Sequence, residues 1–327
     1  MDPYARSSRN YFTKCDLDRM VEKRPDADWL AAQLKKRTTR FVPIWNLKNF
    51  FTDNENLKPI YLSIQDLPDP VPDLNTTVLL GVKEKTAFFT IDLSSSDDST
   101  LGALRARGKF QDIRIAAPLL DAHDGPIMAY TRAITYWHQR HRFCGDCGSP
   151  TENAEGGFLR VCTNEDCRQQ HFPRTDPAII VLVTSGERCL LGRQPSWPEG
   201  MYSTIAGFVE PGESVEDAVV REVREETGID VSGMAYQSSQ PWPFPSSLML
   251  GYIATASNKT IRMDDEELED ARWFSRNELQ DQLLNGTVKI PPHISIAYRL
   301  MESWFDLGDL GPLSKFSVDV DWRKFKR

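Results

Sequence analysis

The sequence of 327 residues lacks a long apolar run. Nowhere do about 18 apolar residues stand together, which is the length needed to cross a bilayer. The first residues, MDPYARSSRNYFTKCDLDRM, also lack the apolar core of a secretory signal, and the last, DWRKFKR, lack an SKL-like peroxisomal address. We therefore expect a cytoplasmic protein without a membrane partner.

An excess of basic residues is also lacking. Aspartate and glutamate outnumber lysine and arginine by 47 to 39, which gives a net charge of -8. Such a balance excludes a general electrostatic attraction to nucleic acid, so a phosphate-bearing ligand must be held at a local site. The hydrophobic share of 40% and the length of the chain predict a soluble globular protein of two or three domains.

Cysteine is scarce, and its six residues are unevenly placed. Cys15 and Cys189 stand alone, whereas the other four fall within 24 residues as a CxxC pair and a CxxxxC pair. Two such pairs suit a structural zinc ion with four thiolate ligands. The alternative is a redox dithiol at the first pair, but no βαβ pattern surrounds it and the second pair would be unexplained. We expect one Zn²⁺ per subunit, bound by Cys144, Cys147, Cys162 and Cys167.

Hydrophobic periodicity divides the chain into two α/β regions. Strands are predicted in the first region at 39–45, 77–82 and 85–93. Apolar residues three or four positions apart then predict a helix over 127–141. A second α/β domain begins near residue 174, where 178–183 is typical of a buried strand that pairs with 188–193. An amphipathic pattern predicts a last helix within 294–305.

The most informative segment is GFVEPGESVEDAVVREVREETGI, residues 207–229. Ser214, followed three residues later by Asp217, predicts the start of a helix, and Gly228 predicts its end. Three acidic residues of this helix fall within an arc of about 100°, and two of them lie at the edge of its apolar face. The three are Glu222, Glu225 and Glu226.

Carboxylates at positions i, i+3 and i+4 repel one another and destabilise a helix unless a positive charge compensates them. A divalent cation such as Mg²⁺ does so when it is shared between carboxylates and the phosphate oxygens of a substrate. The alternative is a solvated surface helix whose acids pair with Arg221 and Arg224.

The complete spacing of residues 207–229 matches the Nudix box at every specified position, so the chain resembles the Nudix hydrolases. The resemblance implies an α/β/α sandwich in which a loop, a helix and a second loop form the catalytic element. It also implies that Glu226 activates water, assisted by Glu222 and Glu225, and that Mg²⁺ or Mn²⁺ is bound. The implied ligands are the carbonyl of Ala206, Glu222, Glu225, Glu226 and, from a later loop, Glu267, which stands beside Asp264, Asp265 and Glu266.

A second segment, SQPWPFPSS at 239–247, holds three prolines, a tryptophan and a phenylalanine. Proline restricts φ and removes a donor, so the segment forms a stiff corner that holds its rings in place. Stacking a base on such a ring contributes about 1 to 3 kcal/mol. Composition alone leaves open whether these rings bind a base or fill a buried corner.

The order of the cysteine pairs, HFPRTDPAII, the box and SQPWPFPSS resembles the NADH pyrophosphatase branch of the Nudix hydrolases over about residues 128–305. The resemblance implies a homodimer that hydrolyses NADH or NAD⁺ to nicotinamide mononucleotide and AMP and, in some members, removes NAD caps from RNA. The implied substrate-binding residues are Phe172, Phe208, Gln240, Trp242, Phe244, Ser247 and Ala297. Phe172 departs from the many members that have tyrosine, so stacking would act there without a hydroxyl contact.

The predicted fold class is thus α/β, with an N-terminal domain placed like a decayed Nudix fold, a zinc ribbon and a Nudix sandwich. The expected boundaries are 1–128 for the first domain, 129–173 for the helix and ribbon, 174–310 for the catalytic domain and 311–327 for a tail. Two alternatives stay open. One is another Nudix specificity, for ADP-ribose or a dinucleoside polyphosphate, and the other is a non-catalytic nucleotide sensor.

Overall fold

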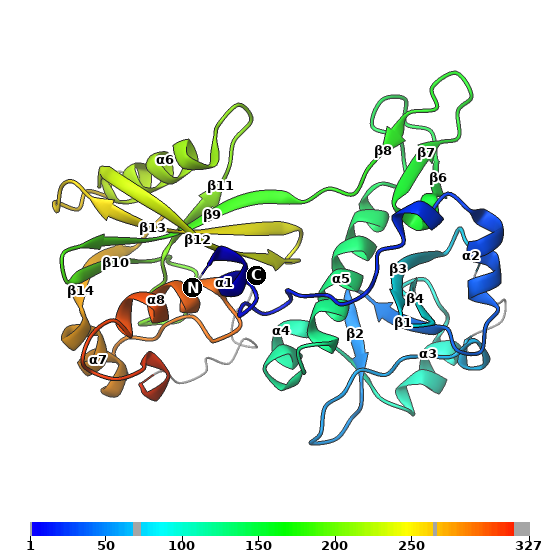
Figure 1. Ribbon diagram of the computed structural model, residues 1–327, viewed down its shortest axis with the longest axis horizontal. Helices are drawn as coiled ribbons and strands as arrows, with labels where there is room; N and C mark the ends of the chain where they lie inside the picture. Colours follow the sequence, from blue (N-terminus) through cyan, green and yellow to red (C-terminus); the bar gives the residue numbers. More distant parts are fainter. Residues whose placement is uncertain (1, 68–72, 264–266, 317–327) are drawn as a thin grey trace. The chain divides into compact units, whose positions relative to one another are not determined.

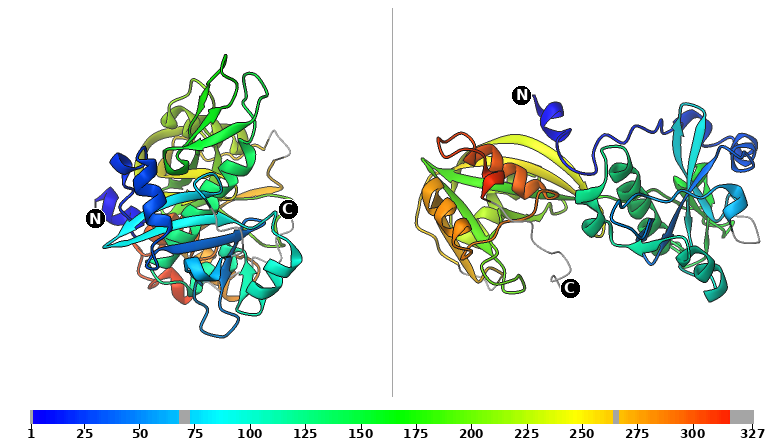
Figure 2. Two further views of the ribbon diagram at one scale, coloured as in Figure 1. Left: turned by 90° about the vertical axis from the view of Figure 1, so that its right-hand side faces the viewer. Right: turned by 90° about the horizontal axis from the view of Figure 1, so that it is seen from below.

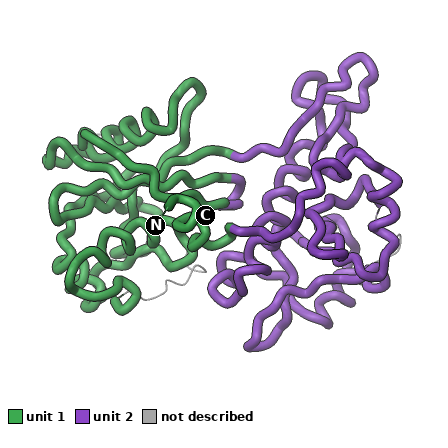
Figure 3. Tube along the Cα trace, in the orientation of Figure 1, with its two compact units in different colours: residues 1–13, 176–241, 247–327 green, residues 14–175, 242–246 purple. Residues whose placement is uncertain are grey.

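The computed structural model describes residues 2–67, 73–263 and 267–316 (Figure 1). Contacts within the chain divide it into two compact units (Figure 3). The first unit contains residues 1–13, 176–241 and 247–327, and the second contains residues 14–175 and 242–246. Each unit therefore includes a short segment that is remote in sequence from the rest of that unit.

The second unit is built on a mixed five-stranded sheet. Its strands are β1 (Arg40–Trp45), β2 (Lys48–Phe51), β3 (Thr77–Lys83), β4 (Thr86–Asp92) and β5 (Lys109–Gln111). They lie in the order β3-β4-β1-β2-β5, with β1 parallel to β4 and the other neighbours antiparallel. These bounds confirm the three strands predicted in this region. Phe41, Phe50, Leu79 and Phe89 are among the side chains that form the core.

Helices and a small sheet complete the second unit. The helices are α2 (Ala27–Leu34), α3 (Asp98–Arg105), α4 (Ile113–Ala116) and α5 (Asp124–Arg140), with short 3-10 turns at Val21–Lys23, Ile64–Asp66, Ala117–Leu119 and Glu155–Gly157. The predicted helix is α5, which packs on β1 and β3 through buried residues that include Ile127, Ile134 and Trp137. The small antiparallel sheet has the order β6 (Thr151–Ala154), β7 (Leu159–Cys162) and β8 (Gln170–His171).

The first unit is built on a six-stranded sheet. Its strands are β9 (Asp176–Ser185), β10 (Arg188–Arg193), β11 (Ile205–Phe208), β12 (Val231–Trp242), β13 (Ser247–Ala256) and β14 (Asp270–Ser275). The order is β12-β13-β9-β10-β14, and β11 pairs with β9. The helices are α1 (Pro3–Ser7), α6 (Val215–Thr227), α7 (Arg276–Leu284) and α8 (Ile296–Phe305), followed by a 3-10 turn at Leu313–Lys315. β10 pairs with β9, as predicted, and the two strands are antiparallel.

The central strand β9 is buried on both faces because helices cover both sides of the sheet (Figures 1 and 2). Side chains alternate along a strand, so neighbouring residues face opposite layers. Ile179, Val181 and Val183 join the core under α6. Ile180 and Leu182 join the core under α8. This arrangement confirms the predicted α/β/α sandwich.

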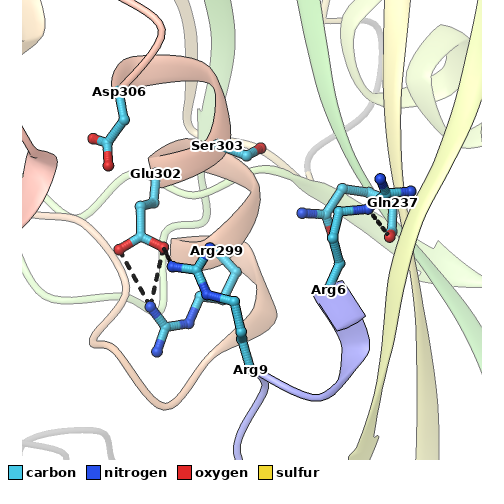
Figure 4. Close-up of a pocket in the computed structure, with 7 residues that line it drawn as sticks. All are labelled: Arg6, Arg9, Gln237, Arg299, Glu302, Ser303 and Asp306. Carbon is cyan, nitrogen blue, oxygen red and sulfur yellow. Dashed lines mark hydrogen bonds and ion pairs between the residues drawn. The ribbon is translucent and has the colours of Figure 1, made fainter. Parts of the chain in front are cut away.

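The N-terminal segment packs on β12 and α8 of the same unit. Nε of Arg6 donates to the carbonyl of Gln237 at 2.6 Å. On α8, Glu302 accepts from Arg9 at 3.1 Å and from Arg299 at 3.0 Å, and these groups line one small pocket (Figure 4). The arginines there are already bonded to protein acceptors, so the contacts serve mainly to hold the segment in place.

Candidate active site and zinc site

The box helix, α6, begins and ends where its sequence predicts. Ser214 is the N-cap and forms a reciprocal capping box with Asp217, whose N–H donates to Ser214 Oγ at 3.1 Å. At the other end Gly228 has a φ of 66°, a left-handed conformation that glycine adopts without strain. The acidic residues between these caps are therefore held on a regular helix.

A glycine on the neighbouring strand makes room for one of these acids. Gly207 lies on β11, opposite Ile179 of β9. A β-carbon on Gly207 would stand 1.9 Å from Cδ of Glu222, which is far inside van der Waals contact. The Glu222 carboxylate therefore lies against the backbone of β11 at Gly207, which directly follows Ala206.

Arg221 connects the loop before the helix with two of the acids. Its Nε and Nη2 donate to the two oxygens of Glu213 at 2.6 and 2.9 Å. Its Nη1 donates to Glu222 at 2.9 Å and to Glu225 at 3.0 Å. A further bond joins Nη2 to the carbonyl of Phe208 at 2.8 Å. One guanidinium thus ties the loop, the strand and the helix together.

The acids bonded to Arg221 have different electrostatic environments. Hydrogen bonds from Arg221 lower the pKa of Glu213 to about 2. Burial raises the pKa of Glu222 despite its bond to Arg221, and the carboxylates of Glu225 and Glu267 add to the rise. Because one arginine is shared by three carboxylates, negative charge remains that it does not compensate, and this is the setting in which a divalent cation is favoured.

The remaining predicted ligands differ in exposure. Glu226 is only 3% exposed, whereas Glu225 and Glu267 are exposed. A merely solvated acidic helix would not bury Glu226. Among the described residues, no three of the four carboxylates of Glu222, Glu225, Glu226 and Glu267 have oxygens within 4.8 Å of one another. These side chains would therefore have to rotate to bind one ion. Asp264, Asp265 and Glu266 lie outside the described residues.

Two of the predicted ring-binding residues are exposed aromatics. Phe208 ends β11 and is 57% exposed, and Phe172, which follows β8, is 64% exposed. They belong to different units. Large apolar rings in contact with water are available to stack on a flat ligand.

Gln240 has a structural position instead. It is fully buried, and its Nε2 donates to the carbonyls of Tyr11 at 3.1 Å and Ile294 at 2.8 Å. Its Oε1 accepts from the N–H of Ile296 at 2.8 Å. Ala297 is also buried, in the core under α8. Both residues hold together the elements of the first unit, and contact with a substrate stays a prediction for them, as it does for the buried Ser247.

The aromatic corner packs with the second unit. The rings of Trp242 and Phe244 meet edge to face at 4.9 Å. Guanidinium groups of Arg114 and Arg132 lie 4.9 and 5.1 Å from the Phe244 ring centroid. Nε of Arg132 also donates to the carbonyl of Pro243 at 2.8 Å. Phe244 thus fills a buried position, while Trp242 is partly exposed.

The four clustered cysteines converge as their spacing predicts. Sγ of Cys144 lies 3.8 Å from that of Cys167, Sγ of Cys147 lies 3.4 Å from that of Cys162, and all four lie within 4.8 Å of one another. Tetrahedral zinc with Zn–S bonds of about 2.3 Å separates its sulfurs by about 3.8 Å. The four thiols fit that geometry, which gives a closed structural site without an open position.

Three family models match successive parts of the chain. A "NADH pyrophosphatase-like rudimentary NUDIX domain" covers residues 38–137, a "NADH pyrophosphatase zinc ribbon domain" covers 139–172, and a "NUDIX domain" covers 174–294. The chain belongs to the Nudix hydrolases, in their NADH pyrophosphatase branch. The N-terminal α/β region is confirmed as a decayed Nudix fold, and the cysteine cluster as a zinc ribbon.

Several relatives match over most of their length. The human "NAD-capped RNA hydrolase NUDT12" is 35% identical over 337 residues, which cover 90% of this chain and 73% of that protein. The human "NAD(P)H pyrophosphatase NUDT13, mitochondrial" is 36% identical and covers 71% of this chain and 72% of its own. The "NAD-capped RNA hydrolase NudC" of Stutzerimonas stutzeri is 44% identical over 59% of this chain and 67% of its own. No helix among the described residues is long and apolar enough to cross a membrane.

Proposed function

We propose that this protein hydrolyses the diphosphate bond of NADH and NAD⁺ to give nicotinamide mononucleotide and AMP, and that it also removes NAD caps from RNA. The observation that carries the proposal is the box geometry, in which Glu222 lies against Gly207 and Glu226 is buried on a helix capped at both ends. The relatives are named for activity on NAD(P)H and NAD-capped RNA, and this supports the proposed substrate class.

The metal in this proposal is Mg²⁺ or Mn²⁺. Its ligands would be Glu222, Glu225, Glu226, the carbonyl of Ala206 and Glu267. All are oxygen donors, which suits a hard divalent cation, and the negative charge of these carboxylates is what such an ion would neutralise. Bound there, the ion would polarise the diphosphate and lower the pKa of a bound water.

The chain's own groups would then position the substrate and move the proton. Glu226 would accept the proton of the attacking water, and its burial limits competition from bulk solvent. Arg221 would hold Glu213 and the loop before the helix in place. No covalent intermediate is required, since water attacks the phosphorus directly.

The dinucleotide's rings would be held by aromatic side chains. Phe208, Phe172 and Trp242 are the rings proposed to stack on nicotinamide or adenine, since each is at least partly exposed. The other residues proposed to line this site are Gln240, Phe244, Ser247 and Ala297. We further propose a homodimer, with domains at 1–128, 129–173 and 174–310 and a tail at 311–327.

Mass-spectrometric product analysis tests the reaction. The purified protein is incubated with NADH, NAD⁺, NAD-capped RNA, ADP-ribose and diadenosine polyphosphate, with and without Mg²⁺ or Mn²⁺. We expect AMP and nicotinamide mononucleotide to form only when the metal is present, and to form fastest from NADH or the capped RNA. Efficient cleavage of ADP-ribose or the polyphosphate with NADH left intact would replace the proposed substrate, and no cleavage of any compound would favour a nucleotide sensor.

A further inference from the structure

The second unit contains a cavity that shares no residue with the box. Its volume is about 610 Å³, within the range of small-molecule sites. The cavity is lined from β3, β4, α5, β6 and β7, so it lies where the decayed Nudix domain meets the zinc ribbon (Figure 1). Because its walls all belong to one compact unit, the cavity is a property of that unit alone.

Most residues that line the cavity have polar side chains. Val78 is its only aliphatic residue among the described side chains, and the imidazole of His138 is its only ring. Hydroxyl groups come from Thr76, Thr90, Ser94, Ser95 and Thr135, and side-chain amides come from four further residues. Such walls offer many hydrogen bonds and little aromatic surface, which favours a hydroxyl-rich ligand over a free nucleobase.

One hydroxyl in this lining has no partner within the protein. Thr135 on α5 is only 3% exposed, and its Oγ1 makes no hydrogen bond. A helical threonine often bonds the carbonyl four residues earlier, as Thr131 does to Ile127 at 2.8 Å. A buried polar atom without a partner is destabilising, so a ligand hydroxyl that reached Thr135 Oγ1 would remove that cost.

The charged groups of the cavity are paired, with one exception. Arg160 donates to His138, Asn153, Thr151 and the carbonyl of His141. Asp92 accepts from Gln139 at 2.8 Å and from Ser94 at 2.5 Å. Burial lowers the pKa of His138 to about 4, so this imidazole is neutral near pH 7.

Arg142 is the exception. Arg142 is exposed and lines the cavity, and its guanidinium forms no hydrogen bond or ion pair with the described residues. A free guanidinium is well suited to bind a phosphate group, because its N–H donors match the phosphate oxygens. From the hydroxyl-rich wall, the unsatisfied Thr135 and the free Arg142, we infer that this cavity binds a sugar phosphate. The phosphate would lie at Arg142 and the sugar hydroxyls near Thr135.

Calorimetric titration of the full chain with ribose 5-phosphate tests this inference. Mg²⁺ and Mn²⁺ are omitted so that the box does not bind the phosphate. Arg142→Ala should weaken binding by about tenfold or more through the loss of a charge-assisted contact. Thr135→Val, which keeps the side-chain shape, should weaken it by roughly threefold. Arg140→Ala is the matched control, since Arg140 is exposed nearby but does not line the cavity.

Further titrations show whether the sugar or the phosphate alone accounts for binding. Ribose and inorganic phosphate should each bind far more weakly than ribose 5-phosphate, and hydrolysis of NADH should be unchanged in Arg142→Ala and Thr135→Val. Absence of ribose 5-phosphate binding at millimolar concentration would overturn the inference. So would equal affinity in the wild type and Arg142→Ala, or a parallel loss of NADH hydrolysis. Because the titration requires no turnover, its result is independent of the proposed activity.

Discussion

The carboxylate of Glu222 occupies the space that a side chain on Gly207 would need, since a β-carbon there would lie 1.9 Å from Glu222 Cδ. Glu222 comes from α6 and Gly207 from β11, so the glycine allows a helix and a strand to approach closely. The box pattern therefore requires glycine at position 207 for a steric reason, because any side chain there would collide with the Glu222 carboxylate.

Gly207→Ala should displace that carboxylate and lower kcat/KM for NADH by about 10- to 100-fold, as is common when the support of a metal ligand is disturbed. Steady-state kinetics at saturating Mg²⁺ measures the effect. Gly233→Ala is the control, because a β-carbon there meets nothing within 4 Å. Wild-type kinetics in Gly207→Ala would mean that Glu222 need not lie where it does.

Glu226→Gln should lower kcat by about 100- to 10,000-fold, the range expected when a general base is removed. Binding of NADH should be largely kept, because the amide has nearly the same shape as the carboxylate. Turnover and equilibrium binding are measured on the same protein. Glu216→Gln, on the exposed first turn of the helix, should leave turnover unchanged. Retained turnover in Glu226→Gln would assign the base to another residue.

Glu213 should make stability depend on pH in the acid range. Its bonds to Arg221 lower its folded pKa to about 2 from an ordinary value of 4.5. A lowered folded pKa stabilises the protein above pH 4.5, and this contribution is lost as the pH falls through that value toward 2. Thermal unfolding should therefore show Glu213→Gln less stable than wild type at pH 7, with the difference shrinking below pH 4.5. Glu210→Gln, in the same loop, should show no such convergence.

Loss of the zinc ion should destabilise the second unit. Cys162 is buried, and its removal would leave three thiols in a site built for four. A loss of about 4 kcal/mol is typical when a metal site is destroyed, and for a unit of this size it lowers Tm by roughly 8 to 16 °C. Metal analysis and calorimetry of Cys162→Ser check both points. Cys15→Ser, at a cysteine outside the cluster, should retain the zinc and the Tm.

Trp242→Ala tests whether the aromatic corner binds a ring of the substrate. Stacking energies of about 1 to 3 kcal/mol correspond to a rise in KM for NADH of roughly 5- to 150-fold. Trp242→Phe keeps a ring and should show a much smaller rise. If both variants have wild-type KM values, the corner only supports the fold, as the burial of Phe244 would allow.

Much of the fold was predictable because its signals are local. The continuous apolar run at 178–183 and the helical pattern of 294–305 follow from which faces are buried, and β9 and α8 are found there. The capping box at Ser214 and the left-handed Gly228 were likewise predictable from neighbouring residues. Four cysteines with zinc spacing also converge, because a closed metal site restricts the chain strongly.

Contacts between distant segments were not predictable in this way. Arg132 bonds Pro243 across 111 residues, and neither position belongs to a pattern that would link them. The resemblance implies a ligand contact for Gln240, but no sequence pattern indicates that its amide also bonds the backbone of Tyr11 and Ile294. The roles of Arg221 and Gly207 were implicit in the box spacing, but only the distances show what each does.

The placement of the first thirteen residues has a consequence for how the chain folds. Asn10 bonds Ser238 and Ser239 at a separation of up to 229 residues, and most of the intervening chain belongs to the other unit. During synthesis this segment emerges before β12 and cannot form these bonds until β12 has followed it. Pairings of such long range close slowly, because the loop entropy is lost before the contacts form. This segment is thus among the last parts of the first unit to reach its final position.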